Sequence, residues 1–124
     1  MLVVDDDPAT RQMLGRMLAR EGWGVSDAEN GRVGLLRMAE QRPDAVLLDL
    51  MMPEMDGFEF VAELRKQKAW RTIPVVVVTS KDLTLEDRKQ LNGYVEQILL
   101  KGAYRTEELL SLVRELVLAS AGQQ

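Results

Sequence analysis

The sequence predicts an α/β fold in which a doubly wound parallel sheet carries helices on both faces. Five short, mainly apolar runs alternate along the chain with five stretches of helical periodicity. The run Ala45–Leu48 shows no polar alternation, which suits a strand that is buried on both faces. Strands and helices that alternate in this way form parallel sheets joined by right-handed crossovers.

The composition fits one domain and excludes several kinds of chemistry. The chain has 124 residues, which is enough for a single domain with its own core. It contains no cysteine and no histidine, which excludes disulfides, thiolate metal sites and imidazole catalysis. A net charge of -4 argues against binding to nucleic acid or to an anionic membrane. No apolar run approaches the roughly 18 residues of a membrane span and no signal peptide is evident, so a cytoplasmic location is expected.

The first two predicted units each join a strand to a helix. Residues 1–4 form the first strand, and Asp7–Pro8 is typical of a helix N-cap and first helical residue. Residues 23–27 form a short second strand, and Asn30–Gly31 turns the chain into a helix that ends at Arg42–Pro43. The residues expected to face inward from these helices are Met13, Leu14, Met17 and Leu18, then Val33, Leu36 and either Met38 or Ala39.

The last three units follow the same order. The strand at 45–48 leads to a helix that opens at Asp56–Gly57, and residues 73–78 give the strongest strand signal in the chain. Thr84 with Asp87 resembles a capping box for a short helix. Residues 95–100 form the fifth strand, after which Thr106 is expected to cap the last helix. The residues expected to face inward are Phe58, Val61, Ala62 and Leu64, then Leu109, Leu112, Val113, Leu116 and Val117.

Polar side chains follow four of the five predicted strands. They are Asp5 and Asp6 after the first strand, Asp49 after the third, Thr79 at the end of the fourth and Lys101 after the fifth. Because the carboxyl ends of parallel strands lie on one edge of the sheet, these residues are expected to converge there. Asp49 alone would fit a loop cap as well as a reactive site, and the convergence of four strand ends favours a site.

The chemistry of this set fits a metal-assisted phosphoryl site. Three carboxylates within a few ångströms raise one another's pKa unless a cation compensates their charge. Mg²⁺ prefers oxygen ligands and is typically held by one or two carboxylates together with a phosphate oxygen. Asp6 and Asp49 can ligate the ion directly and Asp5 through water, while Lys101 supplies a positive charge for an anion. A carboxylate nucleophile, a metal, a lysine and a hydroxyl make a plausible aspartyl-phosphate site.

The motifs VVDDDP, LLDLMMPEMDG and VVVVTS, with Lys101, resemble the receiver domain of two-component response regulators. The resemblance covers essentially the whole chain. The separations also agree with the family pattern, with 43 residues from Asp6 to Asp49, 30 from Asp49 to Thr79 and 22 from Thr79 to Lys101. The resemblance implies a flavodoxin-like (βα)5 fold with strand order 2-1-3-4-5. The receiver domain is expected to cover residues 1–120, followed by a frayed tail at residues 121–124.

The resemblance also implies a role for each site residue. Asp49 would accept a phosphoryl group from the phosphohistidine of a histidine kinase or a histidine phosphotransfer domain. Thr79 and Lys101 would bind phosphoryl oxygens. The Mg²⁺ ligands would be Asp5, Asp6, Asp49 and the Met51 carbonyl. The domain would act in signalling rather than as an enzyme, because it would transfer and lose only its own phosphoryl group. Phosphorylation would shift the population between two conformational states that differ in the surface formed by the fourth helix, the fifth strand and the fifth helix.

Two positions depart from the family pattern. The usual lysine–proline is Lys101–Gly102 here, and because a cis bond without proline costs about 2.5 to 4 kcal/mol, a trans bond and a differently shaped loop are expected. Ile98 replaces the usual aromatic switch residue, for which Tyr94 and Tyr104 are the available substitutes. The run 81–110 is similar to receivers at the C-terminal end of hybrid sensor histidine kinases, so the domain could be tethered to such a kinase.

Two other functions compete with the phosphoacceptor. The departures at Ile98 and Gly102 leave open a degenerate receiver that binds partners independently of phosphorylation, although the intact acidic residues argue against it. An aspartyl-phosphate phosphatase would also attack with a strand-end carboxylate. Such an enzyme needs a second aspartate two residues after the nucleophile, and Met51 occupies that position.

Overall fold

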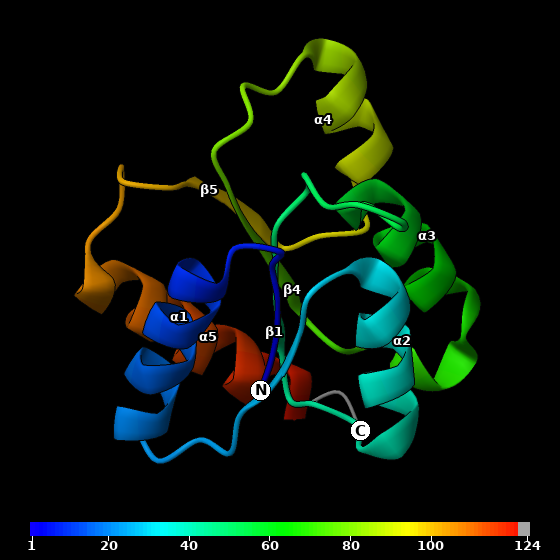
Figure 1. The fold of residues 1–124 in the computed structure, drawn as a ribbon. Helices are drawn as coiled ribbons and strands as arrows, with labels where there is room; N and C mark the ends of the chain where they lie inside the picture. The colour runs from blue at the N-terminus through cyan, green and yellow to red at the C-terminus, as the bar shows by residue number, and fades with distance from the viewer. Residues whose placement is uncertain (122–124) are drawn as a thin grey trace.

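The computed structural model describes residues 1–121, which form a parallel sheet covered by helices on both sides (Figure 1). The strands are β1 (Leu2–Val4), β2 (Ser26–Ala28), β3 (Val46–Leu48), β4 (Val75–Thr79) and β5 (Gln97–Leu100). The helices are α1 (Pro8–Arg20), α2 (Gly31–Glu40), α3 (Gly57–Lys66), α4 (Leu85–Leu91) and α5 (Thr106–Ala121), with a short 3-10 helix, η1 (Lys68–Trp70), before β4. Within these residues the strand order is β2-β1-β3-β4-β5 and all pairs are parallel, which confirms the predicted fold class and order.

Successive strand residues point to opposite faces of the sheet, and each face has its own helices. The strand side chains that pack with α2 and α3 are Leu2, Val4, Ala28, Val46, Leu48 and Val75. Those that pack with α1 and α5 are Val3, Leu47, Val76 and Val78. Figure 1 shows α1 and α5 on one side of the strands and α2 and α3 on the other. The apolar runs lack alternation because both faces of these strands are buried.

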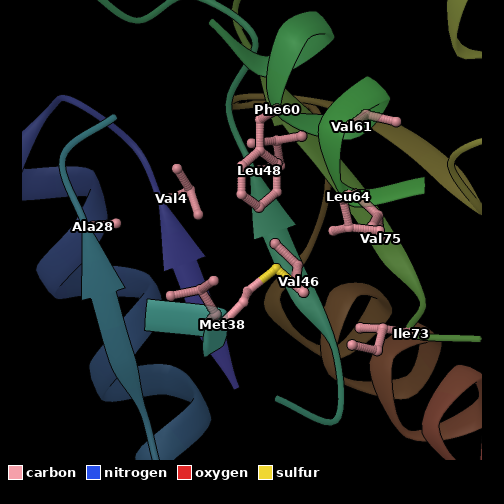
Figure 2. Close-up of a cluster of buried hydrophobic side chains, with 11 residues drawn as sticks. Val4, Ala28, Met38, Val46, Leu48, Phe60, Val61, Leu64, Ile73 and Val75 are labelled. Carbon is pink, nitrogen blue, oxygen red and sulfur yellow. The ribbon is translucent and has the colours of Figure 1, made fainter. Parts of the chain in front are cut away.

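Phe60 fills the space between the sheet and the two helices α2 and α3 (Figure 2). Its side chain is fully buried and belongs to the same core cluster as Leu48 of β3. Burial of such a ring stabilises the fold by about 1.5–3 kcal/mol. Helix α2 can approach the ring because Gly34 has no side chain, and a Cβ there would lie 2.9 Å from the ring and 3.2 Å from Val4.

Side chains cap the starts of four helices, as the sequence signals indicated. Asp7, Asn30 and Asp56 each accept a hydrogen bond from a backbone N–H in the first turn of α1, α2 and α3. Thr84 and Asp87 exchange both hydrogen bonds of the predicted capping box at α4. Because α4 has seven residues, its start depends strongly on this box.

All five strands begin later than predicted, β1 and β3 by a single residue, and one helix cap also differs from the prediction. The second strand is Ser26–Ala28 rather than residues 23–27, because Trp23 packs toward the α1–α5 side and the Gly24 carbonyl binds the N-terminal amine. The fourth strand begins at Val75 and the fifth at Gln97, each two residues later than predicted. Thr106 lies inside α5, which therefore begins one residue earlier than a cap at that position implies.

The inward faces of three helices were also predicted partly wrongly. Met13 on α1 is 52% exposed and Leu36 on α2 is 60% exposed, and Ala62 on α3 is exposed as well. On α3 the buried aromatic residue is Phe60, and Phe58 is half-buried. Successive residues of an α-helix are rotated by about 100°. An apolar face that is assigned one residue too early or too late therefore points toward a different part of the structure.

The end of the chain was predicted to fray from residue 121. Helix α5 includes Ala121, and residues 122–124 lie outside the described residues. Among the helices within residues 1–121, none combines the length and the apolar character that a bilayer span requires.

Arg65 joins two connections at the end of the sheet where β4 and β5 begin. Its guanidinium donates hydrogen bonds of 2.7 to 3.2 Å to the backbone carbonyls of Tyr94, Trp70, Arg71 and Ile73. The Glu96 carboxylate lies 3.6 Å away and accepts a hydrogen bond from the Val75 N–H. Burial lowers the pKa of Arg65 and raises the pKa of Glu96, and their mutual attraction opposes both shifts. A single cation therefore satisfies carbonyls from the α3–β4 and α4–β5 connections.

We expect Arg65→Ala to lower the free energy of unfolding by about 2–3 kcal/mol, because four backbone carbonyls, two of them partly buried, lose a charged donor. Urea unfolding followed by circular dichroism measures the change. Arg105→Ala is the matched control, since Arg105 pairs with Glu108 in an exposed position, and it should change stability by less than about 0.5 kcal/mol. Equal losses in the two variants would contradict this role of Arg65.

Candidate functional site

The strand register brings four strand ends together at the opposite edge of the sheet. Val4 of β1 pairs with Leu48 of β3, and the Asp49 N–H donates to the Val4 carbonyl at 2.9 Å. Asp5 and Asp49 are thus the next residues on two adjacent strands. On the other side of β3, the Lys101 N–H donates to the carbonyl of Thr79 at 2.9 Å.

Asp5, Asp6 and Asp49 form an acidic cluster at this edge. Each offers a carboxylate oxygen, and these oxygens lie within 4.8 Å of one another. Asp5 and Asp49 are buried, at 1% and 3% exposure, whereas Asp6 is exposed. Burial raises the pKa of Asp5, and the Asp49 charge adds to the increase, while the Asp7 N–H and Lys101 oppose it. Two buried oxygens beside an exposed one suit a hard divalent cation that keeps part of its water shell.

Lys101 supplies positive charge to both buried carboxylates. Its ammonium lies 3.0 Å from Asp5 Oδ2 and 3.4 Å from Asp49 Oδ2. Burial alone would lower the pKa of Lys101, but the hydrogen bonds and charges of the two carboxylates outweigh it and raise that pKa. The side chain therefore carries its charge at neutral pH and can pair with an anion added to Asp49.

The backbone around Asp49 is held closely. Asp49 Oδ1 accepts a hydrogen bond from the Leu50 N–H at 2.8 Å, while Oδ2 faces Lys101. Gly57, the first residue of α3, packs directly on this segment. A Cβ at Gly57 would lie 2.6 Å from the Asp49 carbonyl oxygen and 2.7 Å from Leu50 Cα. The glycine permits an approach that any side chain would prevent.

Thr79 and Met51 occupy different surroundings. Thr79 is fully buried at the end of β4, and its hydroxyl oxygen accepts a hydrogen bond from the Lys81 N–H at 3.2 Å. The Met51 side chain is 56% exposed. It lines an open groove of about 550 Å³ together with Asp6, Leu50, Met52, Asp56, Phe58 and Lys81. Metal ligation by the Met51 carbonyl stays a prediction.

A family model described as the response regulator receiver domain matches residues 1–114. The chain belongs to this family. Over 117 residues it is 40% identical to the response regulator MprA of Mycolicibacterium vanbaalenii, a match that covers 94% of this chain and 49% of that protein. This receiver domain therefore spans about half the length of the curated relatives it matches.

Solved receiver domains share the fold. The signal receiver domain of a signal transduction histidine kinase from Syntrophus aciditrophicus has a TM-score of 0.85 and 29% identity, over 95% of this chain and 89% of that one. The receiver domain of a sensor histidine kinase from Pseudomonas aeruginosa has a TM-score of 0.83 and 26% identity, over 94% of each chain. That structure is described as having a magnesium ion coordinated in the active site cleft.

Sequence analysis missed two residues of this receiver domain that hold the site's loops. Lys81 follows Thr79 by two residues, and its ammonium lies 3.2 Å from Asp87, a member of the α4 capping box. Arg11 of α1 binds the Asp5 carbonyl at 2.8 Å. The spacing of two residues between Thr79 and Lys81 could have indicated Lys81 from the sequence. Nothing in the pattern indicated Arg11, because its acceptor at the site is a backbone carbonyl.

The structure shows the surroundings of Gly102 and Ile98, the two residues that depart from the family pattern. The Lys101–Gly102 peptide bond is trans, as expected, and Gly102 has a φ of +79°. Ile98 is half-buried and packs toward the cluster of Leu50, Val77 and Leu91. Tyr104 packs on the opposite side of the sheet, where burial raises its pKa. Tyr94 is 46% exposed.

Gly57→Ala is expected to destabilise the domain by about 1–3 kcal/mol, because the added methyl group meets backbone atoms of Asp49 and Leu50. Chemical unfolding gives the stability change, and the amide NMR signals of Asp49 and Leu50 should move as well. Gly24→Ala provides the control, since a Cβ there has open space among the described residues. Similar stabilities for the two variants would show that α3 can move away from Asp49 at little cost.

Gly102→Pro should cost more than about 1 kcal/mol, because a φ of +79° lies far from the value near −65° that proline imposes. Gly102→Asn should lose much less, since asparagine tolerates a positive φ. Thermal unfolding of the two variants compares them. A proline variant as stable as the parent would mean that the loop readily adopts a different conformation.

Proposed function

We propose that this receiver domain accepts a phosphoryl group on Asp49 from the phosphohistidine of a histidine kinase or a histidine phosphotransfer domain. The observation that carries the proposal is the position of Asp49. It is 3% exposed, lies within the acidic cluster, and faces the Lys101 ammonium at 3.4 Å. A carboxylate flanked by a cation and by two further carboxylates is suited to receive an anion only if a metal ion joins them.

The transfer would form a bond between an Asp49 carboxylate oxygen and phosphorus. The phosphorus–nitrogen bond of phosphohistidine would break, and the imidazole would keep the electron pair. Lys101 would exchange its contact with Asp49 Oδ2 for a phosphoryl oxygen, and the Thr79 hydroxyl would bind another. The backbone N–H of Leu50 would keep the Asp49 side chain directed during the attack.

Mg²⁺ fits the residues present at this edge. Its proposed ligands are Asp5, Asp6, Asp49 and the Met51 carbonyl. The bound ion would neutralise the charge that develops on the phosphoryl oxygens. The cluster oxygens lie within 4.8 Å of one another, and the Pseudomonas aeruginosa receiver described with magnesium in its cleft has the same fold. Asp6, the exposed member, would meet an ion that arrives from solvent.

Phosphorylation would regulate contacts with other proteins. Thr79 and Lys101 are linked to the N-terminal end of α4 and to β5, through the Lys81 contacts and the strand register. The phosphoryl group, whose charge of about -1.5 to -2 would replace the single negative charge of the Asp49 carboxylate, would draw both residues toward it. We propose that this changes the surface formed by α4, β5 and α5. A parent hybrid kinase is one setting in which the domain, proposed to cover residues 1–120, would act.

We expect Asp49→Asn to abolish labelling by the small phosphodonor acetyl phosphate with Mg²⁺, because the amide lacks the nucleophilic oxygen. Intact-protein mass spectrometry detects the added phosphoryl group. Asp7→Asn is the control, since asparagine also caps a helix and Asp7 lies outside the cluster, and it should label like the parent. A base-labile adduct on Asp49→Asn would overturn the assignment. A parent chain that fails to label would favour the phosphorylation-independent interaction module.

Mg²⁺ should bind the free domain with a dissociation constant of about a millimolar or weaker, because the site offers few protein ligands and the ion retains water. Asp6→Ala should remove binding, and Asp5→Ala should weaken it less. Amide NMR shifts during a MgCl₂ titration measure both. If both variants bind as the parent does, the metal site lies elsewhere.

A further inference from the structure

Arg11 connects the acidic cluster to the neighbouring edge strand. It lies near the start of α1, and its side chain is 19% exposed. Its Nη1 donates to the carbonyl oxygen of Asp5 at 2.8 Å, and its Nε donates to Asp27 Oδ2 on β2 at 3.1 Å. One planar guanidinium therefore spans the β1–α1 loop and β2.

The Asp5 carbonyl needs this donor because strand pairing ends beside it. The Asp5 N–H donates to the Ala28 carbonyl at 3.0 Å, and Ala28 is the last residue of β2. The N–H and C=O of a strand residue point to the same neighbouring strand. The Asp5 carbonyl thus points past the end of β2, where Arg11 supplies the donor. A buried carbonyl that loses its partner is costly, so the peptide would turn if Arg11 were absent.

The same peptide unit sets the direction of Asp6. A peptide bond is planar, so fixing the Asp5 carbonyl also fixes the N–H and the Cα of Asp6. On the other side of the loop, Asp5 Oδ1 accepts the Asp7 N–H at 2.9 Å. Asp6 lies between these two contacts, and its carboxylate is the exposed member of the cluster. Its position relative to Asp5 and Asp49 depends on the peptide that Arg11 holds.

We propose that Arg11 is a positioning residue for the metal site, which raises the affinity for Mg²⁺ by holding the Asp5–Asp6 peptide in the orientation that keeps the three carboxylates together. This inference rests on the proposed function, since it requires that the cluster binds Mg²⁺. Arg11 itself does not ligate the ion.

Positioning and simple charge predict opposite effects. Arg11 carries a positive charge close to the site, so by Coulomb repulsion alone its removal would tighten Mg²⁺ binding. Loss of positioning would weaken binding, because outer contacts that orient metal ligands commonly contribute about tenfold or more to affinity. Arg11→Lys separates the effects further. It keeps the charge, but a single ammonium cannot reproduce the two directed hydrogen bonds of the guanidinium.

The test is an NMR titration of the chain with MgCl₂, followed by the amide signals of Asp6, Asp7 and Leu50. We expect Arg11→Met and Arg11→Lys each to raise the Mg²⁺ dissociation constant about tenfold. Arg16→Met, which removes the same charge from an exposed position on α1, should leave it within about twofold of the parent value. Circular dichroism before the titration shows whether each variant is folded, and Arg11→Lys serves alone if Arg11→Met is not.

The outcomes distinguish this inference from the proposed function. Weaker binding by the Arg11 variants, with Arg16→Met unchanged, supports the positioning role. Tighter binding by Arg11→Met together with parent-like binding by Arg11→Lys would show that charge alone acts, and would overturn this inference while the metal site stands. A parent chain that shows no Mg²⁺-dependent shifts at the cluster would overturn the proposed metal site and this inference with it.

Discussion

Two carboxylates buried at one edge of the sheet set the requirements for the surrounding structure. Asp5 and Asp49 lose most of their hydration there, and buried charges persist in proteins only when other groups replace the lost water. Lys101 provides the compensating charge from β5, and backbone N–H groups satisfy the remaining oxygen atoms. This arrangement needs β1, β3 and β5 to end at the same level. The parallel register of the sheet is therefore the condition on which the candidate site depends.

The loops at the two ends of the strands are held in different ways. Where β4 and β5 begin, the guanidinium of Arg65 satisfies four carbonyls and closes the loops onto the sheet. Where the strands end, the loops carry Asp6, Lys81 and Lys101, whose charged groups make fewer contacts and are more exposed. Local opening has a low free energy where contacts are few. The domain thus keeps its more adjustable segments next to the residues proposed to bind the phosphoryl group.

Sequence patterns predicted the fold and the gathering of acidic residues because both depend on local features. A residue that directly follows an apolar strand is placed by that strand, so Asp5 and Asp49 could be located from the pattern. Strand order came from the family resemblance, since periodicity does not specify which strands pair. The rotation of α1 and α3 was predicted less well, as the exposed Met13 and the buried Phe60 show, because apolar residues on adjacent turns compete for the inward position. The contacts of Arg65 were not predicted because its acceptors are backbone carbonyls. Every residue has one, so no sequence motif marks those that bind Arg65.

The close approach of Gly57 to Asp49 makes the two sides of the site mechanically unequal. Helix α3 rests on the backbone of Asp49 and Leu50 with no room for even one methyl group, so this side cannot yield toward the helix. The opposite side ends in Gly102, whose backbone can take up many conformations. If a group is added at Asp49, we therefore expect the β5–α5 loop to move more readily than α3. One side of the site is thus closely packed and the other can adjust, so the packing of the free domain already favours one direction of movement when a ligand binds.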